Sequence, residues 1–182
     1  MRLLGPVEPE EVHAVWLAGE LLSPRFGARV REELANVGAV EELVTAPDLG
    51  DAEQNRLRRE LLDACRLGYY GAWFHLAWHR ARLEPDGVLA IRYIAWDWWL
   101  EVSGGSRMPL DGASWHRAHG EEDRFRPGGP PLIAGRADPS SHLVVIEGHA
   151  RLTALAFHPE EIPRPLEILL GESAAIRGWG CY

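Results

Sequence analysis

Apolar residues recur at helical spacing through most of the first half of the chain. Asp51 follows a Pro- and Gly-containing loop and is suited to cap the helix that begins after it. Residues 1–86 are therefore expected to form a helical N-terminal region. The pattern predicts helices over residues 9–22, 24–45 (with a break near Gly38) and 52–83.

The pattern changes after the turn at Pro85-Asp86-Gly87, where short apolar runs separated by turn residues replace long helical periods. Residues 88–94 fit a strand or a helix equally well. Residues 87–182 are expected to form a small mixed-sheet α/β domain, which makes the fold α+β, with the helical half packed on the sheet. The pattern predicts a short helix over 111–119, strands over 132–134, 143–146 and 166–170, a helix from His149 to about Phe157, and a short helix or turn that ends at Trp179.

Charge and composition narrow the function classes. The net charge of -8 disfavours a surface that tracks phosphates, so binding to duplex DNA is not expected. All 19 basic residues are arginine, which leaves arginine, histidine and backbone N–H groups as phosphate ligands. Cys65 and Cys181 lack metal-site spacing, and no segment reads as a signal peptide or membrane span. A reduced, cytoplasmic protein is the expectation.

The segment Glu147-Gly148-His149-Ala150-Arg151 joins a predicted buried strand to a predicted helix. A glycine there permits a sharp turn, and the first turn of the helix offers unpaired N–H groups and the positive end of its dipole to an anion. Arg151 can present a bidentate guanidinium to a phosphate, and His149 can donate a hydrogen bond or transfer a proton. The alternative is a glycine needed only for geometry and a solvated arginine.

Two segments carry a family resemblance, residues 131–134 and 142–155. Gly148, Arg151 and Ala154 match in register the Gly-x-x-Arg-x-x-Ala pattern that opens a helix in the ParB/sulfiredoxin-like superfamily, and the similarity covers about residues 88–172. The resemblance implies that Gly148, His149, Ala150 and Arg151 bind nucleotide phosphates. This version is most similar to the Asp-Gly-His-x-Arg form of free serine kinases, with Glu147 in place of the aspartate.

The same resemblance implies a chemistry. The kinase-like members place a catalytic glutamate upstream, and Glu101 is the candidate here; Glu147 and His149 are the other candidate catalytic residues. The implied ligand is a nucleotide (ATP, ADP or CTP) with Mg²⁺, and the implied reaction is phosphoryl transfer or phosphate-ester cleavage. His149 stands where sulfiredoxin has its cysteine, and only about thirty residues follow the motif, so neither sulfiredoxin chemistry nor DNA clamping is expected.

Other interpretations stay open beside this one. The chain is either such a phosphotransferase or nucleotide hydrolase, or a non-catalytic nucleotide-sensing or interaction module that forms a homodimer or binds a protein through its Trp-rich helical half. The tryptophans at 96, 98 and 99 either stack on a base or belong to a core. The pairs His75/His79 and His116/His119 have helical metal-ligand spacing, although no metal site is assigned, and Ser103–Arg107 is either an anion cradle or a plain loop.

Overall fold

The computed structural model describes residues 1–65, 76–119 and 129–182, without the side chains of Trp115, Ala118 and His119. The described residues form two compact units. Unit 1 comprises Met1–Val7 and His75–Tyr182, and unit 2 comprises Glu8–Phe74. The boundary expected near residue 86 therefore falls inside unit 1, and the first residues of the chain belong with the sheet rather than with the helices.

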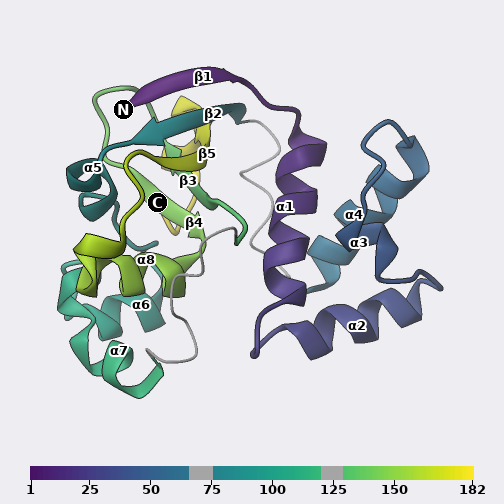
Figure 1. Cartoon of the computed structure of the whole chain (residues 1–182), viewed down its shortest axis with the longest axis horizontal. Coiled ribbons are helices and arrows are strands. Elements are labelled where there is room, and N and C mark those ends of the chain that lie inside the picture. Colours follow the sequence, from purple (N-terminus) through teal and green to yellow (C-terminus); the bar gives the residue numbers. More distant parts are fainter. Residues whose placement is uncertain (66–75, 120–128) are drawn as a thin grey trace. The chain divides into compact units, whose positions relative to one another are not determined.

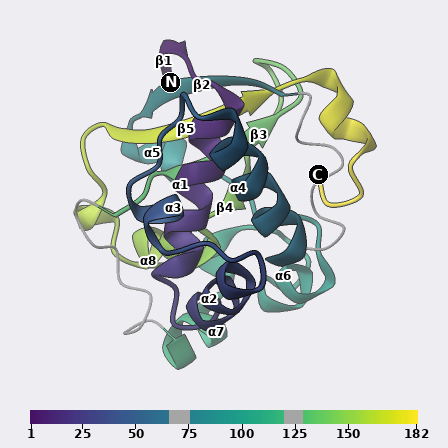
Figure 2. The same cartoon turned by 90° about the vertical axis from the view of Figure 1, so that its right-hand side faces the viewer.

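Unit 2 is helical, as its periodicity predicts (Figures 1 and 2). Asp51 caps the last of its helices, because its carboxylate accepts the N–H groups of Glu53 at 2.9 Å and Gln54 at 3.1 Å. The buried Arg58 donates to the carbonyl oxygens of Leu43 at 3.0 Å and Asp48 at 2.8 Å, which fixes the loop before that helix. The helices are α1 (Pro9–Leu21), α2 (Gly27–Asn36), α3 (Glu42–Thr45) and α4 (Ala52–Cys65).

Unit 1 is built on a five-stranded mixed sheet in the order β1-β2-β5-β3-β4. Only β3 and β5 pair in parallel; the other neighbours are antiparallel. The α+β class expected from the sequence is confirmed, whereas the ParB-like arrangement stays a prediction. The strands are β1 (Arg2–Pro6), β2 (Ala77–Leu83), β3 (Leu132–Arg136), β4 (Val144–Glu147) and β5 (Leu166–Glu172).

Helices of unit 1 pack on this sheet and enclose its core (Figure 1). The core includes Ala134, Val145, Leu152, Leu155 and Ile168, all at or near zero exposure. No helix in the described part of the chain is long and apolar enough to span a bilayer. The helical elements are α5 (Pro85–Leu89), α6 (Asp97–Val102), η1 (Pro109–Asp111), α7 (Ala113–His119), α8 (His149–Phe157), η2 (Pro159–Glu161) and η3 (Ala174–Gly178).

The helix predicted over residues 52–83 is wrong at its end, because Ala77–Leu83 is the strand β2. It pairs with β1 on one side and β5 on the other, and Arg82 forms an ion pair of 2.7 Å with Glu167 directly opposite it. These partners are distant in sequence, so pairing overrides the local helical period. Residues 66–75, including His75, lie outside the described residues.

The sequence left residues 88–94 open between strand and helix, and the structure contains a part of each. Residues 88 and 89 end α5, and Arg92 then makes a single parallel bridge to Val144 at the edge of the sheet. The Arg92 N–H donates to the carbonyl of Leu143 at 2.9 Å, and the Arg92 carbonyl accepts the Val145 N–H at 2.8 Å. This short extended piece partly covers β4, which is otherwise an edge strand of the sheet.

Candidate functional site

The turn between β4 and α8 requires a glycine. Gly148 has a φ of +95°, in the left-handed region that side chains disfavour. A Cβ atom there would lie 2.5 Å from Cδ2 of Leu132 and 3.0 Å from Nη2 of Arg151. The guanidinium of Arg151 therefore lies directly beside the backbone of the turn.

Arg151 is held there by the residue that ends β4. Its Nη2 donates to Oε1 of Glu147 at 3.2 Å, and both side chains are largely buried, with 18% and 17% exposure. The two residues are four positions apart, across the strand-to-helix turn. The predicted phosphate ligand is thus already neutralised by a carboxylate of the protein, so an incoming anion has to compete with Glu147 for the guanidinium.

The N-terminus of α8 carries no side-chain cap. The first N–H groups of a helix have no acceptor within the helix, and the helix dipole adds positive potential at the same point. The expected ligands Gly148, His149, Ala150 and Arg151 therefore share one helix start, with one guanidinium beside it. Geometry of this kind suits a phosphate or carboxylate group.

His149 is set in an aromatic stack that anchors the turn. Its ring lies on Trp99 of α6, with centroids 4.8 Å apart and 12° between planes, and Trp99 lies on Tyr93 at 4.6 Å. The Thr153 hydroxyl donates to the His149 carbonyl at 2.8 Å, so its oxygen accepts a hydrogen bond from the buried Tyr93 hydroxyl. Burial raises the pKa of Tyr93 to about 12.

The sequence did not predict Tyr93 and Thr153 as part of the site. It left Trp99 open between stacking on a base and belonging to a core. A signal for Thr153 exists in the sequence, since it follows His149 by one helical turn and its hydroxyl can return to that carbonyl. Tyr93 carries no such signal, because its contact with Thr153 depends on how the segment before α6 packs against α8. Of the tryptophans weighed as base-stacking residues, Trp99 stacks within the protein, while Trp96 and Trp98 are 46% and 54% exposed.

Glu101, the third candidate catalytic residue, lies exposed on α6. No hydrogen bond or ion pair joins it to the Glu147–Arg151 turn in the part of the chain that the structure describes. The same part holds no group of three or more His, Cys, Asp or Glu side chains suited to a metal ion. The described residues therefore place one carboxylate, Glu147, at the turn, and that carboxylate is engaged by Arg151.

The loop Ser103–Arg107 does not form an anion cradle. It closes the end of α6, with the Gly105 N–H bonded to the Leu100 carbonyl at 2.7 Å and the Gly104 N–H to the Glu101 carbonyl at 3.1 Å. This pair of bonds, with Gly104 at a φ of +59°, is a Schellman motif. The Arg107 N–H is bonded to the Ser103 hydroxyl at 3.0 Å, so the loop uses its N–H groups internally.

Each of the two histidine pairs lies only partly within the described residues. His79 lies on the strand β2, and its proposed partner His75 is outside the described residues. His116 on α7 stacks on Phe157 at 4.5 Å and faces the edge of the His158 ring at 5.6 Å. The side chain of His119 also lies outside the described part. His116 therefore contributes to packing between α7 and the end of α8.

Comparison of the chain with protein-family models, with curated proteins and with solved structures gives no match. The resemblance of the Gly148-to-Ala154 segment to the ParB/sulfiredoxin-like superfamily accordingly remains a prediction. Function has to be inferred from the geometry of the described residues.

Proposed function

We propose that unit 1 binds the phosphate group of a small ligand, such as ATP, ADP or CTP, at the N-terminus of α8. One observation carries the proposal. The start of α8 has no side-chain cap and follows Gly148 at φ +95°, and the guanidinium of Arg151 lies 3.0 Å from where a Cβ atom of residue 148 would be. Backbone N–H groups, helix dipole and guanidinium favour the same anion. The nucleotide itself is supported only by the resemblance described above.

Glu147 competes with an incoming phosphate for the guanidinium of Arg151. Its carboxylate holds Arg151 at 3.2 Å in a largely buried pair, so a phosphate gains the guanidinium only by displacing or sharing it. A ligand with a single negative charge interacts with the Arg151 guanidinium little better than the Glu147 carboxylate does. A dianionic or polyanionic phosphate gains more from the helix dipole and from a second hydrogen bond of the fork, so ligands with more phosphate charge should bind more tightly.

The described residues fit the phosphate better than they fit Mg²⁺. Magnesium is usually held by one or two carboxylates together with substrate phosphates. Glu147 is bonded to Arg151, and Glu101 makes no contact with the turn in the described part of the structure. The proposed role of the site is therefore binding, not phosphoryl transfer or phosphate-ester cleavage. His149 orients the turn through its stack on Trp99.

The test is ligand-induced thermal stabilisation of the full chain. Inorganic phosphate, ADP, ATP and CTP are each titrated with and without Mg²⁺. A ligand at 100 times its Kd stabilises by about 2.7 kcal/mol, which raises Tm by roughly 5–10 °C in a chain of this size. Arg151→Gln should remove most of the shift, and Arg164→Gln, which changes an exposed arginine elsewhere, should preserve it. If no phosphate compound raises Tm in the wild type, the proposal is wrong.

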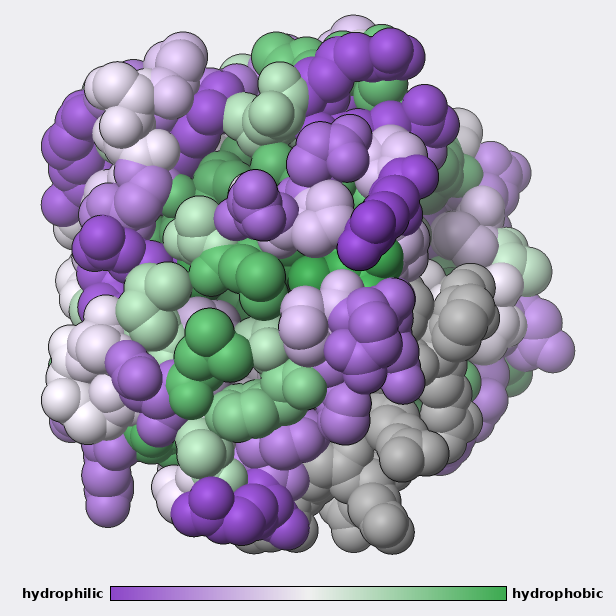
Figure 3. Space-filling view, turned by 60° about the vertical axis from the view of Figure 1, so that its left-hand side comes forward, coloured by the Kyte–Doolittle hydropathy of each residue, from purple (hydrophilic) through white to green (hydrophobic). Residues whose placement is uncertain are grey.

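A second candidate, a protein-binding module, rests on exposed apolar groups. Trp98 on α6, Trp96 directly before α6 and Leu110 on η1 are 54%, 46% and 51% exposed. Figure 3 shows apolar side chains between polar ones on the face of the molecule that it presents. Trp16, in the helical half first expected to carry such a surface, is instead buried and donates to Glu20. Sedimentation of the wild type and of Trp98→Ser would detect self-association through α6.

A further inference from the structure

Arg107 has a backbone conformation that is unusual for a residue with a side chain. Its φ is +64°, and among the described residues it alone, apart from glycines, has a positive φ. Two glycines of the same loop, Gly104 and Gly105, have φ values of +59° and +86°. Glycine adopts this left-handed conformation without strain, so an arginine is expected at position 107 only if its side chain makes contacts that offset the strain.

Those contacts begin with Tyr93, because Arg107 bonds to both of its backbone groups. Nε of Arg107 donates to the Tyr93 carbonyl at 2.8 Å, and the Arg107 carbonyl accepts the Tyr93 N–H at 2.8 Å. Tyr93 is fully buried, and backbone groups without a partner in such a place cost free energy. A single residue therefore satisfies the backbone of Tyr93 and fixes its position.

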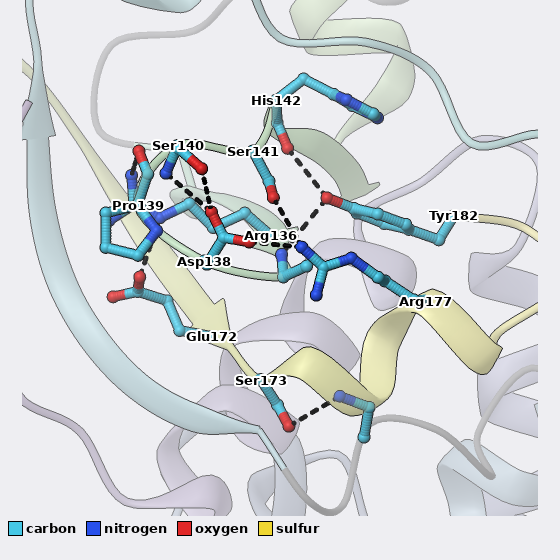
Figure 4. Close-up of polar contacts among 12 residues, drawn as sticks. Arg136, Asp138, Pro139, Ser140, Ser141, His142, Glu172, Ser173, Arg177 and Tyr182 are labelled. Atoms are coloured by element: carbon cyan, nitrogen blue, oxygen red, sulfur yellow. Dashed lines mark hydrogen bonds and ion pairs between the residues drawn. The ribbon is translucent and has the colours of Figure 1, made fainter.

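A second nitrogen of the Arg107 guanidinium is held by Tyr182. Nη1 donates to the main-chain oxygen of Tyr182 at 3.1 Å. The Tyr182 ring stacks on His142 with centroids 5.2 Å apart and 10° between planes. Its hydroxyl donates to the His142 carbonyl at 3.3 Å and accepts the Ala137 N–H at 3.2 Å (Figure 4). The guanidinium is planar, so an anchored oxygen at Nη1 also fixes the direction in which Nε donates.

Tyr93 connects Arg107 to the turn before α8. Its ring stacks on Trp99 at 4.6 Å, and Trp99 stacks on His149 at 4.8 Å. Its hydroxyl is bonded to the hydroxyl of Thr153, which donates to the His149 carbonyl at 2.8 Å. Both the ring and the carbonyl of His149 are therefore held by groups that contact Tyr93. His149 is the first residue of α8, so its orientation sets the direction of the first N–H groups of the helix.

We propose that Arg107 is a positioning residue for the anion site at the start of α8. It acts through Tyr93, whose ring and hydroxyl hold His149 in the orientation that directs the first N–H groups of the helix at a phosphate. Arg107 lies outside the proposed phosphate ligands, so its role differs from that of Arg151. Because this role rests on the proposed function, it is tested both with and without phosphate.

The experiment compares Arg107→Gln and Tyr93→Phe in the full chain. Calorimetric titration with inorganic phosphate measures affinity, and NMR of the backbone amides of residues 148–151 is recorded without phosphate. Each variant should weaken phosphate binding about fivefold, the effect of one typical hydrogen bond, and should shift the amide signals of the turn. Because Arg107 acts through Tyr93, the double variant should lose less affinity than the product of the two single effects.

Two control variants accompany these. Arg177 lies in η3, a few residues before Tyr182, and is bonded to Asp138 rather than to Tyr93 (Figure 4). Arg177→Gln should therefore leave both the phosphate affinity and the amide signals of the turn unchanged. Thr153→Ser keeps the hydroxyl that links Tyr93 to the His149 carbonyl, so it should bind phosphate like the wild type.

The positioning role is overturned if Arg107→Gln binds phosphate like the wild type while its circular dichroism shows an intact fold. It is equally overturned if Arg177→Gln weakens binding as much as Arg107→Gln does. If Arg107→Gln does not fold, Tyr93→Phe, which loses only a hydroxyl, decides the question. If the wild type binds no phosphate, the proposed function is wrong, and unchanged amide signals in Arg107→Gln and Tyr93→Phe would then show separately that Arg107 does not orient the turn.

Discussion

The turn before α8 and the segment around Arg107 each hold one arginine in unit 1, but the partners of the two side chains differ. At the turn, Glu147 neutralises Arg151 at 3.2 Å. Arg107 donates instead from Nε to the Tyr93 carbonyl at 2.8 Å and from Nη1 to the main-chain oxygen of Tyr182 at 3.1 Å. A side-chain carboxylate partner can be displaced by an incoming anion, whereas bonds to main-chain oxygens join segments of the chain that are distant in sequence. The three predictions below change one region at a time.

The largest expected effect comes from Gly148→Ala. The added Cβ meets Leu132 at 2.5 Å, and the residue is forced to keep a φ near +95° or to distort the turn. Backbone strain and overpacking together should lower the free energy of unfolding by about 3 kcal/mol. Urea denaturation measures it. Gly180→Ala, where nothing lies within 4 Å, is the matched control and should change stability by less than about 0.5 kcal/mol.

A smaller effect is expected from Glu147→Gln, which removes the carboxylate that holds Arg151 at the turn. Loss of the ion pair should lower the free energy of unfolding by about 1 kcal/mol, and the released guanidinium should bind phosphate about fivefold more tightly. Calorimetric titration with phosphate measures the affinity. Glu167→Gln breaks the Arg82 pair instead and should leave phosphate affinity unchanged. Equal affinity in the wild type and Glu147→Gln would show that Arg151 does not bind the anion.

The smallest effect concerns pH and His142. Its pKa is held below 6.5 in the folded state, so the unfolded chain takes up the proton first as pH falls. Stability that His142 contributes above about pH 6.5 is therefore lost toward acid pH, and His142→Gln should flatten that part of the curve. Denaturation between about pH 7.5 and 5 measures the difference. His116, whose pKa is also lowered by burial, titrates in both proteins, so a wild-type curve matching the variant would contradict the expectation.

Elements with strong local signals were predicted well from the sequence. The period from Pro9 and the apolar run before Gly148 identify α1 and β4 near their observed bounds, and the capping Asp51 identifies the start of α4. Each signal depends on residues within a few positions of one another, where helix caps and side-chain periodicity act. The glycine turn was predicted in the same way, and its positive φ is confirmed.

Features that depend on distant partners were not predicted. The strand β2 has a helical apolar period and becomes a strand because β1 and β5 pair with it. The stack of Tyr93, Trp99 and His149 joins three segments. No spacing rule brings such residues together, because their approach is decided by sheet register and helix packing.

The order of the strands has a consequence for how the protein forms during synthesis. β1 is made first, but its partner β2 follows only after the whole of unit 2, and β2 in turn pairs with β5 near residue 170. Unit 2 comes from one continuous stretch of the chain and can fold while the ribosome is still translating the rest of unit 1. β1 therefore remains unpaired until β2 has been synthesised. Slow translation should lengthen the time in which chaperones or other unpaired strands can bind β1.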